Sequence, residues 1–279
     1  MELVFDIGGT HIRRGVLSGD TFKLLDKHPT TDLQNRLEEL IASALPMGID
    51  RIGISFAGQV DKGVILSAPN IDLGTLAGCS IPAWIQQRFD LPAAIDNDLK
   101  CAALAEAACY PDAKALAVLY IGTGFGGALV QNGQLIRGCG NQAGEIGHIP
   151  FEKAPFVCGC GKEDCLELST SGSAITRWAH HLGLGDQNLT TIAAQRHENP
   201  KAAEIYDRFL RGLRHSLQTI APLFNPDRII LGGGVIHHNP WLLSTAQEAL
   251  RQAFKPTSGG EVRLSTLADE ANLMGASRL

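Results

Sequence analysis

Short apolar runs separated by glycine-rich turns dominate the first third of the chain. The strand-like runs are LVFDI (3–7), IRRGVL (12–17), RIGISF (51–56), GVILS (63–67) and LPAAID (91–96). Leu33 opens an apolar face with helical spacing that continues through LEELIASAL (37–45), and the alanine-rich LKCAALAEAAC (99–109) favours a second helix. The pattern predicts the opening order strand, strand, helix.

The rest of the chain repeats this alternation with longer helical stretches. The strand-like runs here are ALAVLYIG (115–122), ALVQ (128–131), QLIRG (134–138) and DRIILGGGV (227–235). Asn132-Gly133 predicts a tight hairpin turn between two of them. A helical apolar pattern covers 203–224 and stops before Asn225-Pro226, because the residue before proline disfavours helix.

The length and composition favour a globular α/β protein with two lobes. The chain has 279 residues, 44% hydrophobic content and 31 glycines, enough for a large buried core. We expect a small α/β lobe over 1–110, completed by a C-terminal helix near 270–279, and a large α/β lobe over 111–269. LVFDIGGTHIRRGVL and AVLYIGTGFGGALV share the plan of strand, glycine turn with a threonine, strand, so the two lobes are predicted to contain related hairpins.

The charge pattern argues against nucleic acid and membranes as partners. The formal net charge is -5, with acidic and basic residues interspersed and no basic stripe. The N-terminal segment has no charged signal region, and no apolar run approaches the roughly 18 residues of a membrane span. We therefore expect a cytoplasmic protein that acts on small molecules.

Three glycine-rich turns follow predicted strands, and such turns can bind phosphate. In Asp6-Ile7-Gly8-Gly9-Thr10 and in 122–127, successive backbone N–H groups lie open to an anionic oxygen because glycine has no Cβ. Neither turn continues into the Gly-Lys-Ser/Thr of a Walker A loop. A third turn, 231–234, permits close approach of a flat ring or a ribose. A tight strand-to-helix turn is the alternative for this third segment.

Three of the seven cysteines and one histidine gather in residues 148–165. In a reducing compartment an odd number of scattered cysteines is poor disulfide material, so a metal explains the gathering better. The candidate ligands are His148, Cys158, Cys160 and Cys165. Three thiolates and one imidazole complete a tetrahedral shell, which is typical of a closed structural Zn²⁺ site. We call this segment the predicted zinc knuckle.

Six motifs occur along the chain in an order and spacing that point to one protein family: FDIGGTHI, IDNDLKCAALAE, IGTGFGG, AGEIGH, CGCGKEDCLE and LGGGV. By these motifs the chain resembles the ROK sugar kinases from residue 4 to about residue 275. The resemblance implies the two-lobed actin/Hsp70/hexokinase-like ATPase fold, with ribonuclease H-like lobes and the active site in the interlobe cleft. It also implies phosphoryl transfer from ATP to a sugar, Mg²⁺ with the nucleotide, and a homodimer.

The resemblance assigns roles to individual residues. Asp98 matches the base that takes the proton of the sugar hydroxyl, although the residues alone explain it equally well as a helix N-cap. Asp6 matches a carboxylate that reaches Mg²⁺ through water, with turn stabilisation as the alternative. The other sugar-binding positions are Asn70, Asn97, Glu145, His148 and Glu167. The nucleotide positions are Gly8, Gly9 and Thr10, then Gly122, Thr123, Gly124 and Gly126, then Gly232, Gly233 and Gly234 for adenosine.

Three positions depart from the pattern of the family. Lys100 stands where asparagine is common, His11 where lysine is common, and Asp164 where glycine usually precedes the last cysteine. We expect Lys100 to face solvent, and Asp164 to maintain a tight turn with positive φ. These departures leave the reaction intact and weaken any inference about the sugar.

The resemblance favours a kinase that phosphorylates the 6-hydroxyl of glucose. Glu145 in GEIGH and Asn70 in a Pro-Asn pair match many glucokinases of the family. N-acetylglucosamine, N-acetylmannosamine and fructose are alternative substrates. A sugar-sensing ROK regulator without a DNA-binding domain is a remote alternative, because such repressors carry a helix-turn-helix before DIGGT and only five residues precede Asp6 here. Asp98 argues against an actin- or Hsp70-like module that only binds.

Overall fold

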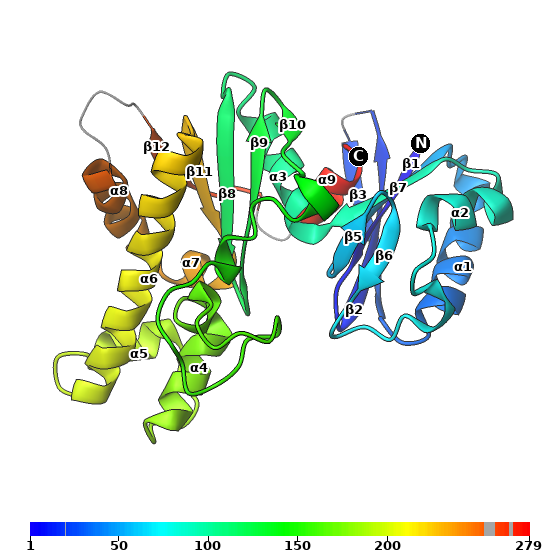
Figure 1. Ribbon diagram of the computed structural model, residues 1–279. Coiled ribbons are helices and arrows are strands. Elements are labelled where there is room, and N and C mark those ends of the chain that lie inside the picture. Colours follow the sequence, from blue (N-terminus) through cyan, green and yellow to red (C-terminus); the bar gives the residue numbers. More distant parts are fainter. Residues whose placement is uncertain (20, 254–259, 268–269) are drawn as a thin grey trace. The chain divides into compact units, whose positions relative to one another are not determined.

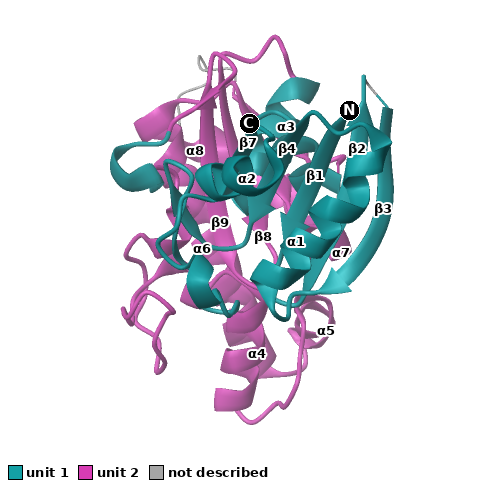
Figure 2. Cartoon of the chain, turned by 90° about the vertical axis from the view of Figure 1, so that its right-hand side faces the viewer, with its two compact units in different colours: residues 1–109, 137–142, 269–279 teal, residues 110–136, 143–268 magenta. Residues whose placement is uncertain are grey.

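The computed structural model describes residues 1–19, 21–253, 260–267 and 270–279. The chain forms two compact units, coloured separately in Figure 2. Unit 1 comprises residues 1–109, 137–142 and 269–279, and unit 2 comprises residues 110–136 and 143–268. The short segment 137–142 thus joins unit 1, whereas the sequence places it within the large lobe. The predicted lobe boundary at residue 269 lies outside the described residues.

Unit 1 is built on a five-stranded sheet with the order β3-β2-β1-β4-β7 (Figure 1). Its strands are β1 (Glu2–Ile7), β2 (His11–Ser18), β3 (Thr21–Pro29), β4 (Arg51–Phe56) and β7 (Ala93–Asn97). β1 pairs antiparallel with β2 and parallel with β4, and β7 pairs parallel with β4. A separate two-stranded sheet consists of β5 (Gln59–Asp61) and β6 (Val64–Ser67). The helices are α1 (Leu33–Ala44), α2 (Ile81–Phe89), α3 (Asp98–Cys109) and α9 (Ala271–Ala276), with 3-10 turns η1 (Leu45–Met47), η2 (Gly74–Leu76) and η3 (Cys139–Asn141).

Two glycines let α9 approach the rest of unit 1 at backbone distance. A Cβ at Gly275 would lie 1.7 Å from the carbonyl oxygen of Cys101 in α3. A Cβ at Gly53 in β4 would lie 2.2 Å from the carbonyl oxygen of Ala276. Because no real side chain tolerates such distances, α9 is packed directly on α3 and on the sheet.

Unit 2 repeats this plan in its own five-stranded sheet, with the order β10-β9-β8-β11-β12. Its strands are β8 (Ala115–Ile121), β9 (Phe125–Gln131), β10 (Gln134–Leu135), β11 (Arg228–Gly232) and β12 (Glu261–Leu264). β8 pairs antiparallel with β9 and parallel with β11, as β1 does with β2 and β4. The helices are α4 (Gly172–His181), α5 (Leu189–Gln195), α6 (Pro200–Phe224), α7 (Gly234–His238) and α8 (Leu242–Ala253), with 3-10 turns η4 (Ile146–His148) and η5 (Leu166–Leu168). The predicted pair of related hairpins is therefore present.

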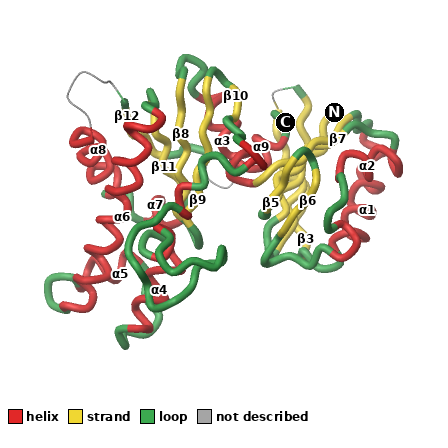
Figure 3. The backbone as a smooth tube through the Cα atoms, viewed as in Figure 1, coloured by secondary structure: helices red, strands yellow, loops and turns green. Residues whose placement is uncertain are grey.

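The long helix α6 supplies much of the core of unit 2. Its buried residues recur at helical spacing and include Ile205, Phe209, Leu213 and Leu217. Helix α6 ends at Asn225, whose φ of 49° is the left-handed conformation that closes many helices. By contrast, Figure 3 shows the stretch between β10 and α4 as loop over most of its length. The GEIGH and cysteine motifs lie in that loop.

The predicted opening order was wrong because it omits β3. This strand lies at the edge of its sheet, and most of its residues are exposed or only half-buried. Edge strands carry charged residues on both faces, so they lack the apolar alternation that reveals a strand. The turn at Lys62-Gly63 connects β6 with the short strand β5, which the apolar runs of the sequence do not indicate. Within the described residues, no helix is both long and apolar enough for a membrane span.

Candidate active site and metal cluster

Asp96, Asn97 and Asp98 form the junction between β7 and α3 in unit 1. β7 runs parallel to β4, with Ser55 opposite Asp96 and Phe56 opposite Asn97. The strand continues directly into the helix, so the junction lies at the carboxyl edge of parallel strands, where α/β folds bind their ligands. The structure thus places Asp98, the predicted base, at the first residue of α3.

The side chain of Asn97 caps the N-terminus of α3. Its Oδ1 accepts hydrogen bonds from the backbone N–H groups of Leu99 (3.0 Å) and Lys100 (3.4 Å), and its Nδ2 donates to the carbonyl of Gly58 (3.1 Å). Asp98 is half-buried, and its Oδ1 accepts from the N–H of Leu99 at 2.8 Å. The helix-cap explanation, considered for Asp98 from the sequence, therefore applies to Asn97.

Lys100 is buried, and the expectation that it faces solvent was wrong. Its exposed fraction is 1%. Residues Cys101–Ala103, Ala105 and Glu106 of α3 are buried as well, because α9 covers this helix through the close approach at Gly275. A helix that is covered on several sides has almost no solvent face. The alanine-rich sequence of α3 gives no sign of this.

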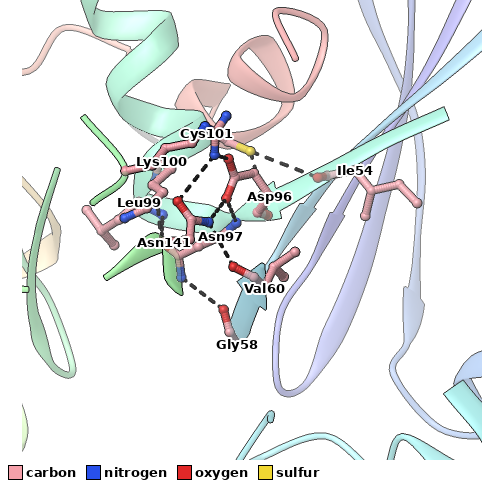
Figure 4. Close-up of polar contacts among 10 residues, drawn as sticks. Ile54, Gly58, Val60, Asp96, Asn97, Leu99, Lys100, Cys101 and Asn141 are labelled. Atoms are coloured by element: carbon pink, nitrogen blue, oxygen red, sulfur yellow. Dashed lines mark hydrogen bonds and ion pairs between the residues drawn. The ribbon is translucent and has the colours of Figure 1, made fainter. Parts of the chain in front are cut away.

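A buried carboxylate, Asp96, ties the same junction to the loop that follows β10. Asp96 is 2% exposed and accepts hydrogen bonds from Asn141 Nδ2 (2.7 Å) and from the backbone N–H of Asn97 (2.8 Å). The guanidinium of Arg137 forms an ion pair with its Oδ2. Figure 4 shows Asn141 between Asp96 and the carbonyl of Val60, to which Asn141 also donates at 2.8 Å. Sequence reasoning missed Arg137 and Asn141, because IRGCGN indicates only the return of a hairpin.

The first of the predicted phosphate-binding turns, called here the first phosphate turn, connects β1 with β2 and includes Gly8, Gly9 and Thr10. The N–H of Gly8 donates to the carbonyl of His11 at 2.9 Å, which closes the turn, while Gly9 and Thr10 are exposed. A Cβ at Gly9 would lie 3.0 Å from the Cβ of Asn70. The structure therefore brings the predicted sugar-binding asparagine against the first phosphate turn.

Asp6, at the end of β1, is engaged in four hydrogen bonds. Arg13 donates to its Oδ2 from Nε (3.0 Å) and Nη2 (2.6 Å), and Ser55 Oγ and Asn272 Nδ2 each donate to Oδ1 at 3.1 Å. A carboxylate already paired with a guanidinium is a poor direct ligand for Mg²⁺, so the donor set fits only an outer-shell contact through water. Arg13 is a further residue that the sequence analysis missed. The signal for it is its position directly opposite Asp6 in the β1–β2 register.

The second predicted phosphate-binding turn, residues 122–127, comprises the three residues between β8 and β9 in unit 2 and the first three residues of β9. Two backbone groups at the start of α4 hold it, because Gly172 N–H donates to the carbonyl of Gly122 (2.8 Å) and Ser173 N–H to that of Thr123 (3.0 Å). These bonds satisfy amides at the N-terminus of α4 that have no partner within the helix. The turn is thus fixed by the helix that follows the cysteine motif.

Glu167 connects this second turn with the predicted zinc knuckle. Its Oε2 accepts from the N–H of Phe125 at 2.8 Å, and a Cβ at Gly124 would lie 2.6 Å from the same oxygen. Its Oε1 accepts from Cys158 Sγ at 3.6 Å. Gly147 of the GEIGH motif also touches the turn, since a Cβ there would lie 1.9 Å from the carbonyl of Phe125. The predicted sugar-binding Glu167 is therefore also a structural link within unit 2.

The third glycine turn borders a cavity of about 300 Å³ in unit 2. Gly233 has a φ of 89°, and a Cβ there would lie 2.5 Å from the carbonyl oxygen of Ile121, so only glycine fits. The cavity is lined by the apolar side chains of Ile175, Leu189 and Val235, the polar side chains of Asn188, Thr190, His238 and Asn239, and the glycines Gly172 and Gly234. Apolar walls with convergent polar groups are typical of small-molecule sites.

His148, Cys158, Cys160 and Cys165 come together as a cluster. Their four candidate ligand atoms all lie within 4.8 Å of one another. Cys158 Sγ is 3.6 Å from His148 Nδ1, and Cys160 Sγ is 3.3 Å from Cys165 Sγ. Tetrahedral Zn²⁺ with Zn–S bonds of about 2.3 Å sets neighbouring sulfurs roughly 3.8 Å apart. The donor set and its spacing therefore fit a closed zinc site, and we call these four residues the cysteine–histidine cluster.

The backbone around the cluster forms a tight loop whose sharp turn is at Gly161. Gly161 has a φ of 89°, and its N–H donates to the carbonyl of Cys158 at 2.9 Å. Asp164 does not have a positive φ, so the expectation for this residue was wrong. Its carbonyl accepts from the N–H of Phe151 at 2.7 Å, in a ladder-like contact that needs ordinary backbone. Gly161 supplies the flexibility, and Asp164 replaces glycine without strain.

The thiols of the cluster differ in acidity. Burial raises the pKa of Cys158 and of Cys165. For Cys160, burial is outweighed by hydrogen bonds from the backbone of Lys162 and from the thiols of Cys165 and Cys158, and its pKa falls below the usual value. Zinc binds thiolates, so the charge of the ion is needed to deprotonate the two buried cysteines.

The two ring nitrogens of His148, in the GEIGH motif, have different surroundings. The N–H of His148 donates to the carbonyl of Glu145 at 3.1 Å, and Glu145 itself is exposed. Because Nδ1 points to Cys158, the Nε2 atom is the one that remains for another ligand. The predicted site residues thus form two sets. Asp6, the first turn, Asn70, Asn97 and Asp98 belong to unit 1, and the other two turns, Glu145, Glu167 and the cluster belong to unit 2.

Comparison with known proteins decides the family. A model of the ROK family matches residues 3–279. The chain belongs to the ROK family. It is 28% identical to a relative named glucokinase from Halalkalibacterium halodurans, over 98% of this chain and 93% of that protein. It is 29% identical to an N-acetyl-D-glucosamine kinase from Vibrio cholerae, over 84% of each.

A solved ROK structure supports the same assignment at the level of the fold. The ROK family glucokinase from Streptomyces griseus, in complex with glucose and AMPPNP, matches with a TM-score of 0.74 and 28% identity. The match covers 99% of this chain and 98% of that one. The predicted family and the actin/Hsp70/hexokinase-like ATPase fold class of this ROK chain are therefore confirmed. The roles of the individual site residues stay predictions.

Proposed function

We propose that this chain is an ATP- and Mg²⁺-dependent hexose kinase that phosphorylates the 6-hydroxyl of a sugar, with glucose as the preferred substrate. The observation that carries the proposal is the β7–α3 junction. Asn97 caps the helix there, and Asp98 presents a carboxylate at its first residue. Phosphoryl transfer needs little covalent help, but a carboxylate that accepts the hydroxyl proton aligns the nucleophile.

In this proposal the sugar is bound by side chains that can form hydrogen bonds in addition to those they already make within the protein. Asn97 uses one Nδ2 hydrogen for Gly58, so its second is available to a hydroxyl. His148 offers Nε2, and Glu145 is exposed. Each Glu167 oxygen accepts one hydrogen bond within unit 2, and carboxylate oxygens accept more than one. Leaving a buried hydroxyl unpaired costs about 1 to 3 kcal/mol, so these partners select the sugar.

The nucleotide would be held chiefly by backbone groups. The first and second turns present N–H groups suited to phosphate oxygens, and the cavity beside Gly234 has the walls of a site for adenine and ribose. Mg²⁺ would accompany the phosphates, with Asp6 in its outer shell. Zn²⁺ in the cysteine–histidine cluster would supply structural rigidity, because four protein ligands leave no position for water.

N-acetylglucosamine is the second candidate substrate. The Vibrio cholerae relative named for that sugar is as similar to this chain as the glucokinases are. Glucose is favoured by Glu145 and by Asn70, which lies against the first turn. N-acetylmannosamine and fructose are further alternatives. A coupled assay of ADP release over these sugars and mannose ranks the substrates by kcat/KM, and NMR of the product identifies the phosphorylated hydroxyl.

Asp98→Asn tests the proposed base. The substitution preserves shape and removes the proton acceptor, so kcat should fall by about 10²- to 10⁴-fold with the sugar KM little changed. Asp90→Asn is the matched control, because Asp90 ends α2 in the left-handed conformation that asparagine also adopts. Near-normal turnover of Asp98→Asn would show that another group takes the proton.

A further inference from the structure

The carboxylate of Asp96 is buried, and two side chains of one short segment contact it. Asp96 is 2% exposed, and a buried charge is strongly unfavourable unless it is paired and hydrogen-bonded. Arg137 supplies the opposite charge at Oδ2, and Asn141 donates to Oδ1 at 2.7 Å. Both partners lie in residues 137–142, the piece of chain that joins unit 1 between two stretches of unit 2.

Asn141 holds several groups at once. Its Nδ2 donates to Asp96 and to the carbonyl of Val60 in β5, and its Oδ1 accepts from Arg137 Nη1 at 3.3 Å. It is 8% exposed and has a φ of 58°, a conformation that asparagine tolerates better than most residues. Figure 4 shows this arrangement next to Asn97, which reaches Gly58 before β5 in the same way. The end of β7 is therefore bound to the β5 region by two amide side chains.

Asp96 is hydrogen-bonded directly to the backbone of Asn97, one of the residues proposed to act on the sugar. Its Oδ1 accepts the backbone N–H of Asn97 at 2.8 Å, and this bond sets the backbone just before Asp98. On the other side, the chain runs from Asn141 into the GEIGH motif within a few residues. Arg137 and Asn141 thus lie, in sequence, between the proposed base and the proposed sugar-binding Glu145.

We propose that Arg137 and Asn141 are positioning residues for phosphoryl transfer, which act by clamping Asp96 and so fixing Asn97 and Asp98. The inference rests on the proposed role of Asp98 as base. A displacement of about 1 Å in a reacting group can cost about 100-fold in rate, so a clamp on the preceding residues affects kcat even though it touches no substrate. Neither Arg137 nor Asn141 needs to contact the sugar or the nucleotide.

Alanine and lysine substitutions of Arg137 test the clamp. Arg137→Ala and Asn141→Ala should lower kcat by about 10- to 100-fold, while the KM for ATP changes by less than about 3-fold. Arg137→Lys, which restores the charge, should recover part of the loss. The Arg137 side chain is 49% exposed, so guanidinium at a low, non-denaturing concentration should also restore part of the kcat of Arg137→Ala.

Arg88→Ala is the matched control. Arg88, in α2, forms an ion pair with Glu38, in α1, at 2.9 Å within unit 1. Its loss should leave kcat and guanidinium sensitivity as in the wild type. Combining Arg137→Ala with Asp96→Asn should give a loss smaller than the product of the two single losses, because both changes break the same pair.

Three results separate this inference from the proposed function. If Arg137→Ala and Asn141→Ala keep a kcat within about 2-fold of Arg88→Ala, the clamp does not position the base, and the inference is overturned. It is equally overturned if kcat falls only in step with thermal stability and neither lysine nor guanidinium restores it. If Asp98→Asn remains active, the base assignment fails, whatever the Arg137 variants show.

Discussion

At the scale of single residues, Glu167 connects two parts of unit 2, the second phosphate turn and the cysteine–histidine cluster. One oxygen accepts the amide of Phe125 in the second phosphate turn, and the other accepts the thiol of Cys158. Substitution of a residue that only bound the sugar would leave nucleotide affinity unchanged. The contact with Phe125 predicts instead that substitution of Glu167 lowers nucleotide affinity, because the turn loses the acceptor that fixes one of its amides.

Glu167→Ala should weaken nucleotide binding in the absence of any sugar. A hydrogen bond to a charged group contributes about 1.5 to 3 kcal/mol, so the affinity for AMPPNP should fall by roughly 10- to 100-fold. Glu167→Gln keeps an acceptor for Phe125 and should lose less. Calorimetry of AMPPNP binding measures the effect, with the exposed Glu163→Gln as control in the same loop. Unchanged AMPPNP affinity in Glu167→Ala would confine the residue to the sugar.

Sequence motifs revealed the residues that are neighbours along the chain, such as Asn97 and Asp98 or the cysteines of the cluster. The partners of Asp96 were not predictable in this way, because Arg137 and Asn141 meet it only after the chain has returned to unit 1. The burial of Lys100 was missed for a related reason, since it depends on α9, which is distant in sequence. Local pattern carries no information on either contact.

At the scale of elements, Arg14 fastens the edge of the first sheet to a helix. From β2 its guanidinium pairs with Asp26 in β3, and its Nη1 donates to the carbonyl of Leu40 (2.6 Å) and to Ser43 Oγ (2.7 Å) in α1. Arg14 is 9% exposed. The pKa of Asp26 lies below its ordinary value, because the hydrogen bond and charge of Arg14 outweigh the opposing effect of burial.

Arg14→Ala should lower the free energy of unfolding by about 1.5 to 3 kcal/mol at neutral pH. A depressed folded-state pKa gives stability that is present above the ordinary carboxyl pKa and lost as the pH falls through the folded-state value. The difference between wild type and variant should therefore shrink below about pH 4. Urea unfolding from neutral to acidic pH measures it. Arg36→Ala, which breaks an exposed pair with Glu39 in α1, serves as control and should change little. A pH-independent difference would contradict the role given to Asp26.

Elements with a regular pattern of apolar and polar positions were predictable, and elements in which apolar and polar positions do not alternate clearly were not. β1, β2, α1, β8 and α6 each bury a regular set of apolar positions, and the sequence indicated all of them. The edge strand β3 and the short β5 carry few buried residues. Their strand conformation comes from pairing with a neighbour, which periodicity does not record.

At the scale of the whole molecule, each unit has its own hydrophobic core. Cys158 and Cys165 are part of the core of unit 2, together with Leu166, Leu168 and residues of α4 and α6. The core of unit 1 consists of residues from β1, β4, α1 and their neighbours. Loss of a metal from the cysteine–histidine cluster should therefore destabilise unit 2 and have little effect on the stability of the core of unit 1.

We predict about one Zn²⁺ per chain by elemental analysis, and local loosening of unit 2 when it is removed by chelation. Hydrogen exchange followed by mass spectrometry should show faster exchange in residues 148–168 and in the Gly122–Gly127 turn, which Glu167 joins to the cluster. Strands β1 and β4 should exchange as before. Cys160→Ser should reproduce the pattern without chelator, whereas Cys109→Ser, at an exposed cysteine in unit 1, should not. Uniform loosening of both units would contradict the separate cores.

The backbone contact between α9 and α3 has a consequence for synthesis on the ribosome. β1 emerges before every described element of unit 2, yet the unit that contains it is not complete until Gly275 has reached Cys101. By then every described strand and helix of unit 2 has already been translated. Unit 1 is thus begun before unit 2 and finished after it, which differs from the usual order in which domains fold as they emerge. Until that moment the nascent chain exposes the unfinished surface of α3 to chaperones and proteases.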